Sequence, residues 1–246
     1  MVNSSLTLFE RCILILTAAL TITGIISTNT NLVWFEQVYA VEDGLVENVT
    51  LLPLLMMACS GVYYLVNLSA KRSWLFSMNI AAVIVFSIFI AGEEISWGQR
   101  MFNIESTDFF VQNNAQKEVN LHNLVVNGKK LNKIIFSQLL TVVAIVYLVI
   151  FPVFYGKKKN LRDLVDNAGI PVPQWYQIAC CLLIFVSIAL IPSGKNAEIL
   201  EMGFTHMFVL IFLFPENRHV FRKNKVSSPI RISTFNEAIE PDIDDR

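Results

Sequence analysis

The stretch WLFSMNIAAVIVFSIFIAGEEISWGQR, residues 74–100, decides the fold, because an uncharged apolar run ends abruptly in a group of polar side chains. A helix needs about 20 apolar residues to cross a hydrocarbon core about 30 Å thick. The run therefore predicts a transmembrane helix near 74–92. Two adjacent carboxylates, a tryptophan, an amide and an arginine follow at its end, which predicts a polar site at one face of a membrane.

The composition of the whole chain agrees with this prediction. Of 246 residues, 54% are hydrophobic and only 16% are charged, whereas charged residues make up about 25% of an ordinary soluble domain. The mean hydropathy is +0.53, which is typical of a polytopic membrane protein. The four cysteines all fall inside apolar runs without a CxxC pair, so neither a disulfide framework nor a cysteine metal site is expected.

Five further windows are long and apolar enough to span a membrane. Spanning segments must be helical, because open strands leave backbone groups without hydrogen bonds in lipid. The sequence thus predicts an all-α, polytopic transmembrane helical bundle of about six spans, with a partly helical outer loop. The spans are expected near 9–28, 45–66, 74–92, 134–154, 175–192 and 199–215.

The last two spans are separated only by SGKNAEI, which predicts a tight helical hairpin. Residues 1–223 are expected to form the transmembrane domain. Residues 224–246 contain few large apolar side chains and end in acids, so they are expected to form a disordered cytoplasmic tail.

The distribution of charge predicts the orientation, because Lys and Arg near the ends of spans are retained in the cytoplasm. With the N-terminus inside, 13 of the 19 basic residues lie on the cytoplasmic side. An even number of spans then places both termini in the cytoplasm. The same arrangement puts 11 of the 20 acidic residues at or beyond the outer ends of the spans.

The first acidic segment is EDGLVE, 42–47, which opens the second span. Glu42 and Asp43 are well explained as N-terminal residues of a helix whose dipole favours anions. Glu47 lies one turn deeper, where a carboxylate needs a partner. It is therefore a candidate ligand for a bound cation.

The second segment is the end of the opening stretch. If the third span continued as a helix, Glu93, Trp97 and Arg100 would stack on one face at i, i+4 and i+7, while Glu94 would point elsewhere. Glu93 and Arg100 are then expected to form an ion pair around the tryptophan. The alternative is a plain helix end in water, with Trp97 at the membrane interface and Arg100 extending towards the headgroups.

Two more segments carry polar residues to the outer side. In NAQKEVNLHN, 114–123, alternation places Asn120 and His122 on one side of the chain, although a single loop histidine is more often a solvated surface residue. In EILEMGFTH, 198–206, Glu198, Met202 and His206 form one helical stripe. Ionisable side chains inside spans usually face the bundle interior with a partner, so His206 is either part of a site or a hydrogen-bonded core residue.

Carboxylates and histidines at one depth are suited to two tasks. They can hold a divalent metal ion, which would be the cofactor, or they can pass protons or cations. The motifs of common enzymes are missing from the sequence, including HExxH, a glycine-rich phosphate loop and G-x-S-x-G. The basic run KKKNLR is expected to contact anionic lipid, and nucleic-acid binding is not expected.

Three motifs together, EDGLVE, GEEISWGQR and NLHN, resemble a family of uncharacterised polytopic bacterial inner-membrane proteins. The resemblance covers roughly residues 40–125. It implies a multi-pass protein of the bacterial inner membrane with a shared polar site, and it implies no particular activity. Glu201 and His206 lie outside the matching region.

The leading hypothesis is a carboxylate and histidine pocket at the outer membrane face that binds a cation or a polar lipid headgroup. In one version it is a membrane-embedded enzyme acting on a lipid-linked substrate. The expected catalytic residues are Glu93, Glu94 and His122. The expected substrate-binding residues are Trp97, Gln99, Arg100, Asn120 and Asn123, and the expected metal ligands are Glu47, Glu93, Glu94, His122 and His206.

Two alternatives come from other functional classes. The first is a small ion- or proton-coupled transporter or channel subunit that uses Glu47, Glu93 and His206 as a relay. The second is a membrane scaffold or assembly protein, in which the polar groups only pack loops. The sequence leaves the reaction, the substrate, the metal and the oligomeric state open.

Overall fold

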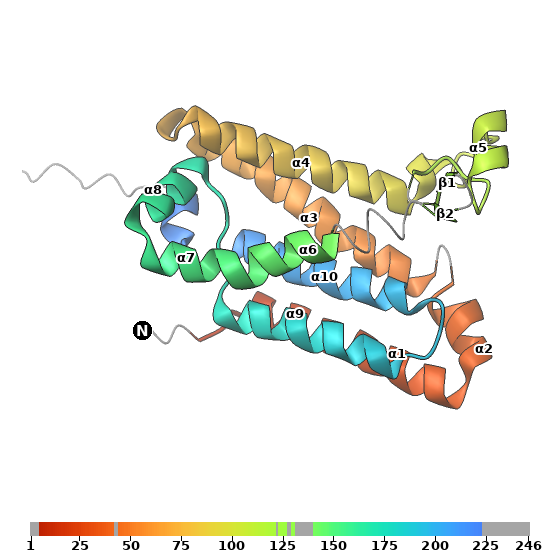
Figure 1. Cartoon of the computed structure of the whole chain (residues 1–246). Helices are drawn as coiled ribbons and strands as arrows, with labels where there is room; N and C mark the ends of the chain where they lie inside the picture. The colour runs from red at the N-terminus through yellow and green to blue at the C-terminus, as the bar shows by residue number, and fades with distance from the viewer. Residues whose placement is uncertain (1–4, 42–43, 122, 127–128, 131–139, 223–246) are drawn as a thin grey trace, which may run out of the picture.

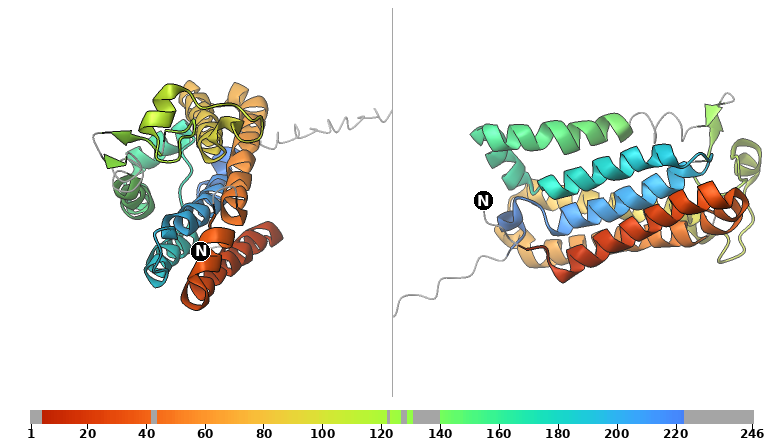
Figure 2. Two further views of the ribbon diagram at one scale, coloured as in Figure 1. Left: turned by 90° about the vertical axis from the view of Figure 1, so that its right-hand side faces the viewer. Right: turned by 90° about the horizontal axis from the view of Figure 1, so that it is seen from below.

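A computed structural model describes residues 5–41, 44–121, 123–126, 129–130 and 140–222. In these residues the chain is almost wholly helical, and the long helices run side by side in an elongated bundle (Figures 1 and 2). We call the two ends of the bundle the Glu94 end and the Glu10 end, after two residues that lie there. In Figure 1 the Glu94 end is on the right, beside α2 and α5, and the Glu10 end is on the left, beside α8.

Within the described residues, four helices are long and apolar enough to cross a membrane. Many of their large apolar side chains point out of the bundle, such as Ile15 (68% exposed), Val66 (78%) and Val85 (67%). Such surfaces are stable against hydrocarbon and unfavourable in water. The four helices are α1 (Leu8–Thr30), α3 (Leu45–Leu68), α4 (Trp74–Glu94) and α10 (Asn196–Leu213).

The other two predicted spans are shorter helices. Residues 134–139 of the window 134–154 lie outside the described residues. The remainder forms α6 (Leu140–Ile145), a π-helical turn (Val146–Ile150) and α7 (Phe151–Lys157). Helix α9 (Trp175–Ser187) continues as a 3₁₀ turn (Ile188–Leu190). The all-α fold is thus confirmed with four helices of spanning length, and a total of six spans remains a prediction.

The predicted hairpin of the last two spans is present. Helix α9 packs against α10, and the side chain of Gln177 on α9 donates a hydrogen bond to the backbone oxygen of Leu210 on α10 (3.0 Å). The short connection is held at the Glu94 end, where Ser193 donates to the carboxylate of Glu36 (2.7 Å). The start of α10 is therefore fixed at the same end of the bundle as the last turn of α4.

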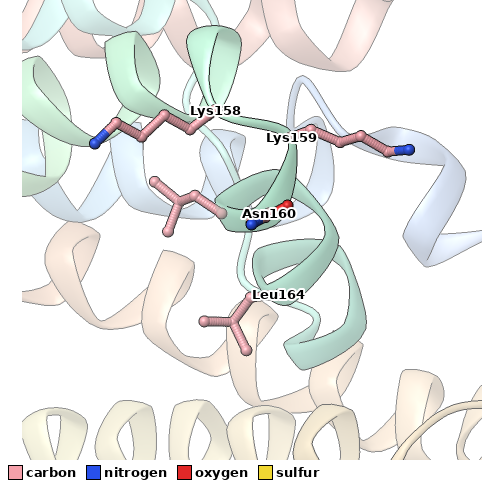
Figure 3. A pocket seen from close by; sticks show the side chains of 5 residues that line it. Lys158, Lys159, Asn160 and Leu164 are labelled. Atoms are coloured by element: carbon pink, nitrogen blue, oxygen red, sulfur yellow. The ribbon is translucent and has the colours of Figure 1, made fainter.

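At the Glu10 end, two buried or partly buried acids tie distant segments together. Glu10 on α1 is fully buried and accepts hydrogen bonds from Tyr176 (2.7 Å) and Arg218 (3.2 Å). Asp166 accepts from Tyr155 (3.0 Å) and from Asn217 (2.9 Å). Asp166 belongs to α8 (Lys159–Ala168), a short helix that starts at a sharp corner after α7 (Figure 3).

The C-terminal end of the described chain is a 3₁₀ turn, Arg218–Phe221, which lies in this polar network. Buried charges are tolerated where they are paired and hydrogen-bonded. The predicted cytoplasmic tail, residues 224–246, lies outside the described residues. The predicted division of the chain at residue 223 therefore stays a prediction.

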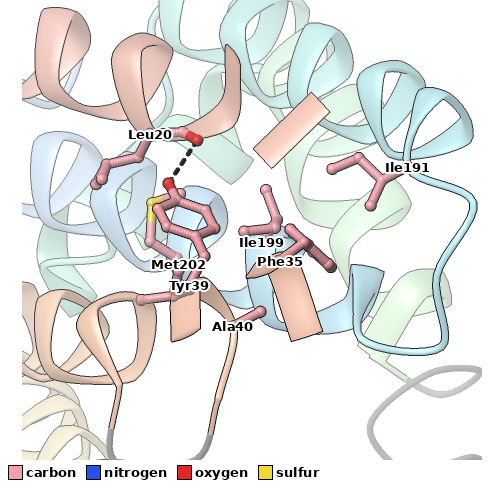
Figure 4. Close-up of a cluster of buried hydrophobic side chains, with 8 residues drawn as sticks. Leu20, Phe35, Tyr39, Ala40, Ile191, Ile199 and Met202 are labelled. Carbon is pink, nitrogen blue, oxygen red and sulfur yellow. Dashed lines mark hydrogen bonds between the residues drawn. The ribbon is translucent and has the colours of Figure 1, made fainter. Parts of the chain in front are cut away.

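A hydrophobic cluster near the Glu94 end joins α1, the chain after it and α10 (Figure 4). After α1 the chain forms α2 (Leu32–Trp34) and a π-helical turn (Phe35–Tyr39) that folds back under the bundle. Tyr39 is buried against Met202 and Ile199, and its hydroxyl donates to the backbone oxygen of Leu20 (2.7 Å). Burial raises the pKa of Tyr39 to about 12, so the hydroxyl keeps its proton and the hydrogen bond.

Candidate functional site

Helix α4 ends at Glu94, and the chain then reverses in a tight turn. Ser96, Trp97 and Gly98 all have left-handed backbone conformations, with φ of 47°, 54° and 76°. This conformation is uncommon for residues other than glycine and persists only where the surroundings hold it. The turn also brings the ring of Trp97 back over Gly92, where an added Cβ atom would meet the ring at 2.9 Å.

The predicted stack of Glu93, Trp97 and Arg100 on a continued helical face is therefore wrong. The helix stops because the left-handed turn redirects the chain before Arg100 is reached. Arg100 forms an ion pair with Glu118 (3.2 Å), a partner that the sequence did not indicate. The contact between Glu93 and Trp97 does exist, but through the turn rather than along a helix.

Glu93 is a buried hydrogen-bond acceptor, with only 3% of its surface exposed. One carboxylate oxygen accepts from the indole nitrogen of Trp97 (2.8 Å), and the other accepts from the backbone nitrogen of Leu121 (2.5 Å). Hydrogen bonds to a charged group are worth about 1.5–3 kcal/mol each. Glu93 therefore connects the end of α4, the turn and the loop before residue 122.

Glu118 forms the centre of a second set of contacts. It accepts hydrogen bonds from the hydroxyl of Ser96 (2.5 Å), the guanidinium of Arg100 (3.2 Å) and the side-chain nitrogen of Asn120 (3.4 Å). Asn120 is buried and also donates to Ser96 (2.9 Å). Glu118 was named in the sequence only as one polar residue of the segment 114–123, and Ser96 was not identified, because their contacts depend on the turn.

The other amides singled out in the sequence also have partners inside this loop. Gln99 donates to Ser106 (2.6 Å) and accepts from the backbone nitrogen of Val119 (2.7 Å). Asn123 donates to the side-chain oxygen of Gln116. These contacts lie within the segment that follows α4, which also contains α5 (Asp108–Asn113) and the short strands β1 (Val125–Val126) and β2 (Lys129–Lys130). Their proposed contact with a substrate stays a prediction.

Glu94 has a different environment from its neighbour. It lies within electrostatic range of Glu47 at the start of α3 and of Glu198 and Glu201 at the start of α10, as well as of Glu93. We call these five residues the carboxylate cluster. Glu47, Glu93 and Glu94, and the segment 198–206 that carries Glu198 and Glu201, were all assigned to this side from the sequence. A shared ligand role for these acids stays a prediction.

His206 lies deeper in the bundle and is completely buried. Its Nδ1 atom is 2.6 Å from the backbone oxygen of Met202. A carbonyl oxygen only accepts, so Nδ1 carries the proton, and in the neutral ring Nε2 is then an acceptor. Among the described residues, the buried Nε2 has no hydrogen-bond partner, and neither do the buried hydroxyls of Ser87 on α4 and Thr21 on α1.

The predicted set of metal ligands is only partly visible. His122, with Glu42 and Asp43, lies outside the described residues. Among the described residues, no group of three or more His, Cys, Asp or Glu side chains is arranged to hold a metal ion. The ligand set Glu47, Glu93, Glu94, His122 and His206 therefore remains a prediction, and so does the catalytic role of Glu93, Glu94 and His122.

The structure defines the class of protein as an all-α bundle with four helices of membrane-spanning length and acidic side chains gathered at one end. The sequence matches no protein-family model, and neither a curated protein nor a solved structure is significantly similar to it. What the Glu94 end can do is therefore inferred from its own side chains.

Proposed function

We propose that this chain is a multi-pass membrane protein that binds a cation at the carboxylate cluster. The observation that carries the proposal is the gathering of acids from three helices around Glu94. Like charges repel strongly where the dielectric constant is low, and a bound cation offsets that repulsion. Carboxylate oxygens are also the ligands that hard cations such as Ca²⁺ and Mg²⁺ prefer.

The two adjacent glutamates are assigned separate roles in this proposal. Both oxygens of Glu93 accept hydrogen bonds from Trp97 and Leu121, so Glu93 positions the outer loop. Glu94 has acids from α3 and α10 around it, so it is the central residue for the cation. Glu47 on α3 and Glu201 on α10 supply further carboxylate oxygens.

The setting proposed for this site follows the distribution of charge. We place the Glu94 end on the outer face of a bacterial inner membrane, with six spans and both termini in the cytoplasm. An enzyme acting on a lipid-linked substrate would use the same cation to polarise a phosphate or carbonyl oxygen. In that version Glu93, Glu94 and His122 are the acid and base groups.

The proposal is tested by the thermal unfolding of detergent-purified protein after chelation, with Ca²⁺, Mg²⁺, Mn²⁺ or Zn²⁺ added back. A cation that binds only the folded state raises the unfolding temperature, and the rise increases with the logarithm of its concentration once that exceeds the dissociation constant. We expect at least one of these ions to stabilise the wild type, and Glu94→Gln and Glu201→Gln to lose that effect.

The matched control is Glu105→Gln, which removes an exposed carboxylate of the same outer segment. It should respond to the ion as the wild type does. The proposal is rejected if no ion stabilises the wild type, or if Glu94→Gln and the wild type respond equally.

A second candidate function, proton- or ion-coupled transport, is favoured by one observation. The buried Nε2 of His206 and the buried hydroxyls of Ser87 and Thr21 have no hydrogen-bond partner in the part of the chain that the structure describes. Orphaned polar atoms inside a bundle are costly unless something binds or passes there. In this second candidate function, Glu47, Glu93 and His206 form a relay that passes protons or cations.

Transport is tested with protein reconstituted into liposomes under a pH gradient. We expect flux above that of empty liposomes, and flux close to background for His206→Gln. If the wild type shows only background flux, transport is rejected and the cation site is not affected by that result.

A further inference from the structure

A hollow lined partly by lysines lies at the Glu10 end of the bundle, at the other end of the helices from the carboxylate cluster. Helix α7 ends and α8 begins at a sharp corner around Lys158. An open hollow of about 560 Å³ occupies this corner. Figure 3 shows Lys158 and Lys159 extending to opposite sides of the start of α8, with Leu164 one turn further along the helix. The hollow is lined by Lys158, Lys159, Asn160, Leu161 and Leu164.

Helix α8 is amphipathic, and only part of its apolar surface is covered. Val165 is buried against Tyr155 and Val172, which fixes the helix to the bundle. Leu164 on α8 is 55% exposed, and Phe154 on α7 is 42% exposed. An exposed apolar surface next to a row of lysines is typical of helices that lie in the headgroup region of a membrane.

The positive charge at this corner comes from three consecutive exposed lysines, 157–159. Within the described part of the chain, none of the three forms an ion pair. The Nζ atom of Lys158 lies 5.1 Å from the centre of the Phe154 ring, which keeps the amine beside an exposed aromatic surface. The start of α8 adds to the positive potential, because Lys158 at its N-cap makes no side-chain capping bond and the dipole of a helix is positive at its N-terminus.

The nearby Arg162 has a different role. Its guanidinium donates to the backbone oxygens of Gly156 (2.8 Å) and Tyr155 (3.3 Å) and lies over the Tyr155 ring. It therefore closes the end of α7 and is not available to an external anion. The acidic Asp166 is also occupied, by Tyr155 and Asn217. The lysines are thus the cationic groups that face outward.

We infer that the corner between α7 and α8 binds anionic phospholipid headgroups, with Lys158 and Lys159 contacting headgroup phosphates and Leu164 contacting the lipid below them. A lipid fits better than a soluble acidic partner, because the lysines stand directly beside the exposed apolar side chains of Phe154 and Leu164. Each lysine near an anionic leaflet strengthens binding about fivefold, equivalent to about 1 kcal/mol. The site is independent of the proposed cation site.

The test uses the full chain in nanodiscs containing phosphatidylcholine with a minor fraction of phosphatidylglycerol. Native mass spectrometry after release from the nanodiscs measures which lipid stays bound. We expect the wild type to retain phosphatidylglycerol in preference to phosphatidylcholine, and a Lys158→Gln, Lys159→Gln double variant to lose about twenty-five-fold of that preference.

Two controls keep the test interpretable. Lys71→Gln removes an exposed lysine at the same end of the bundle but outside the hollow, and it should behave as the wild type does. The variant Lys158→Arg, Lys159→Arg keeps the charge and should keep the preference. The inference is overturned if the glutamine double variant retains phosphatidylglycerol normally, or if Lys71→Gln loses it equally.

If the glutamine double variant fails to fold, the salt dependence of lipid retention by the wild type tests the inference instead. Retention of phosphatidylglycerol by the wild type should fall as salt rises from about 0.1 M to about 1 M, because the screening length shortens from about 10 Å to about 3 Å. A preference that does not change with salt overturns the inference.

Discussion

Glu93 and Glu94 are adjacent in the chain, yet their carboxylates have different neighbours. Helix α4 ends at Glu94, and the chain reverses directly after it. Glu93 points towards the turn, where the indole of Trp97 and the backbone of Leu121 donate to it. Glu94 lies within electrostatic range of acids on α3 and α10. Substituting each residue separately should therefore give opposite effects on stability.

The first prediction concerns Glu93→Gln. The variant keeps the size of the side chain but removes the charge that strengthens both hydrogen bonds, so the free energy of unfolding should fall by about 1.5–3 kcal/mol. Equilibrium unfolding in detergent measures this, with Glu105→Gln as a surface control expected to change by less than about 0.5 kcal/mol. A Glu93→Gln variant as stable as the wild type would show that the hydrogen bonds contribute nothing.

The second prediction concerns the buried hydroxyl of Tyr39. In Tyr39→Phe the backbone oxygen of Leu20 loses its donor, which should cost about 0.5–1.5 kcal/mol at neutral pH. Because folding raises the pKa of Tyr39 from 10.0 to about 12, this stabilisation is fully present below about pH 10. It is lost as the pH rises from about 10 towards about 12.

Unfolding curves of the wild type and Tyr39→Phe at a series of pH values test this dependence. The difference between the two proteins should be constant from pH 7 to about pH 9 and should shrink above about pH 10. A difference that grows above pH 10 would contradict the burial of a neutral hydroxyl.

At the scale of the elements, the long helices follow directly from the sequence, whereas the turn after α4 does not. The expected spans 9–28, 45–66 and 74–92 lie within α1, α3 and α4. These helices could be predicted because a membrane-spanning helix is recognised by the length of its apolar run alone. Helical periodicity continued beyond Gly92 predicts a stack of Glu93, Trp97 and Arg100, which the left-handed turn prevents. Gly98 is the only residue of the turn whose type signals a left-handed backbone.

The partners of the polar loop residues could not be predicted for a related reason. Gln99, Arg100 and Asn120 bond to residues that become neighbours only after the chain has reversed at Ser96 and Trp97. Sequence spacing describes neighbours along a helix and gives no information on such contacts. The predicted contact of these residues with a substrate stays a prediction.

The third prediction concerns the contact between the C-terminal 3₁₀ turn and α1. In Arg218→Gln, the fully buried Glu10 loses the charged donor that lies 3.2 Å away. Removing one partner of a buried ion pair costs about 3–5 kcal/mol. Because Arg218 is 26% exposed and Tyr176 still donates to Glu10, we expect a loss of about 1–3 kcal/mol.

Limited proteolysis and unfolding in detergent measure this effect. Cleavage near the C-terminal turn should become faster in Arg218→Gln, while Arg222→Gln, an exposed neighbour, should be cleaved at the wild-type rate. Equal cleavage of Arg218→Gln and the wild type would show that the ion pair does not hold the turn.

At the scale of the whole molecule, the bundle has two chemically different ends. The Glu94 end gathers acids from α3, α4 and α10, and the Glu10 end carries the exposed lysines of the α7–α8 corner. The charge distribution along the sequence predicted this separation, because the helices are long and alternate in direction. The packing that brings Glu198 and Glu201 close to Glu94 joins residues more than 100 positions apart, and no local pattern specifies it.

The most direct test of the account compares Glu94→Gln with Glu93→Gln in thermal unfolding, first after chelation and then with the stabilising cation restored. Without the cation, Glu94→Gln should unfold at or above the wild-type temperature, because one of several mutually repelling charges is gone. It should gain nothing from the cation, whereas Glu93→Gln should unfold earlier and still respond. A Glu94→Gln variant that is stabilised by the cation as much as the wild type would contradict a cation site at the carboxylate cluster.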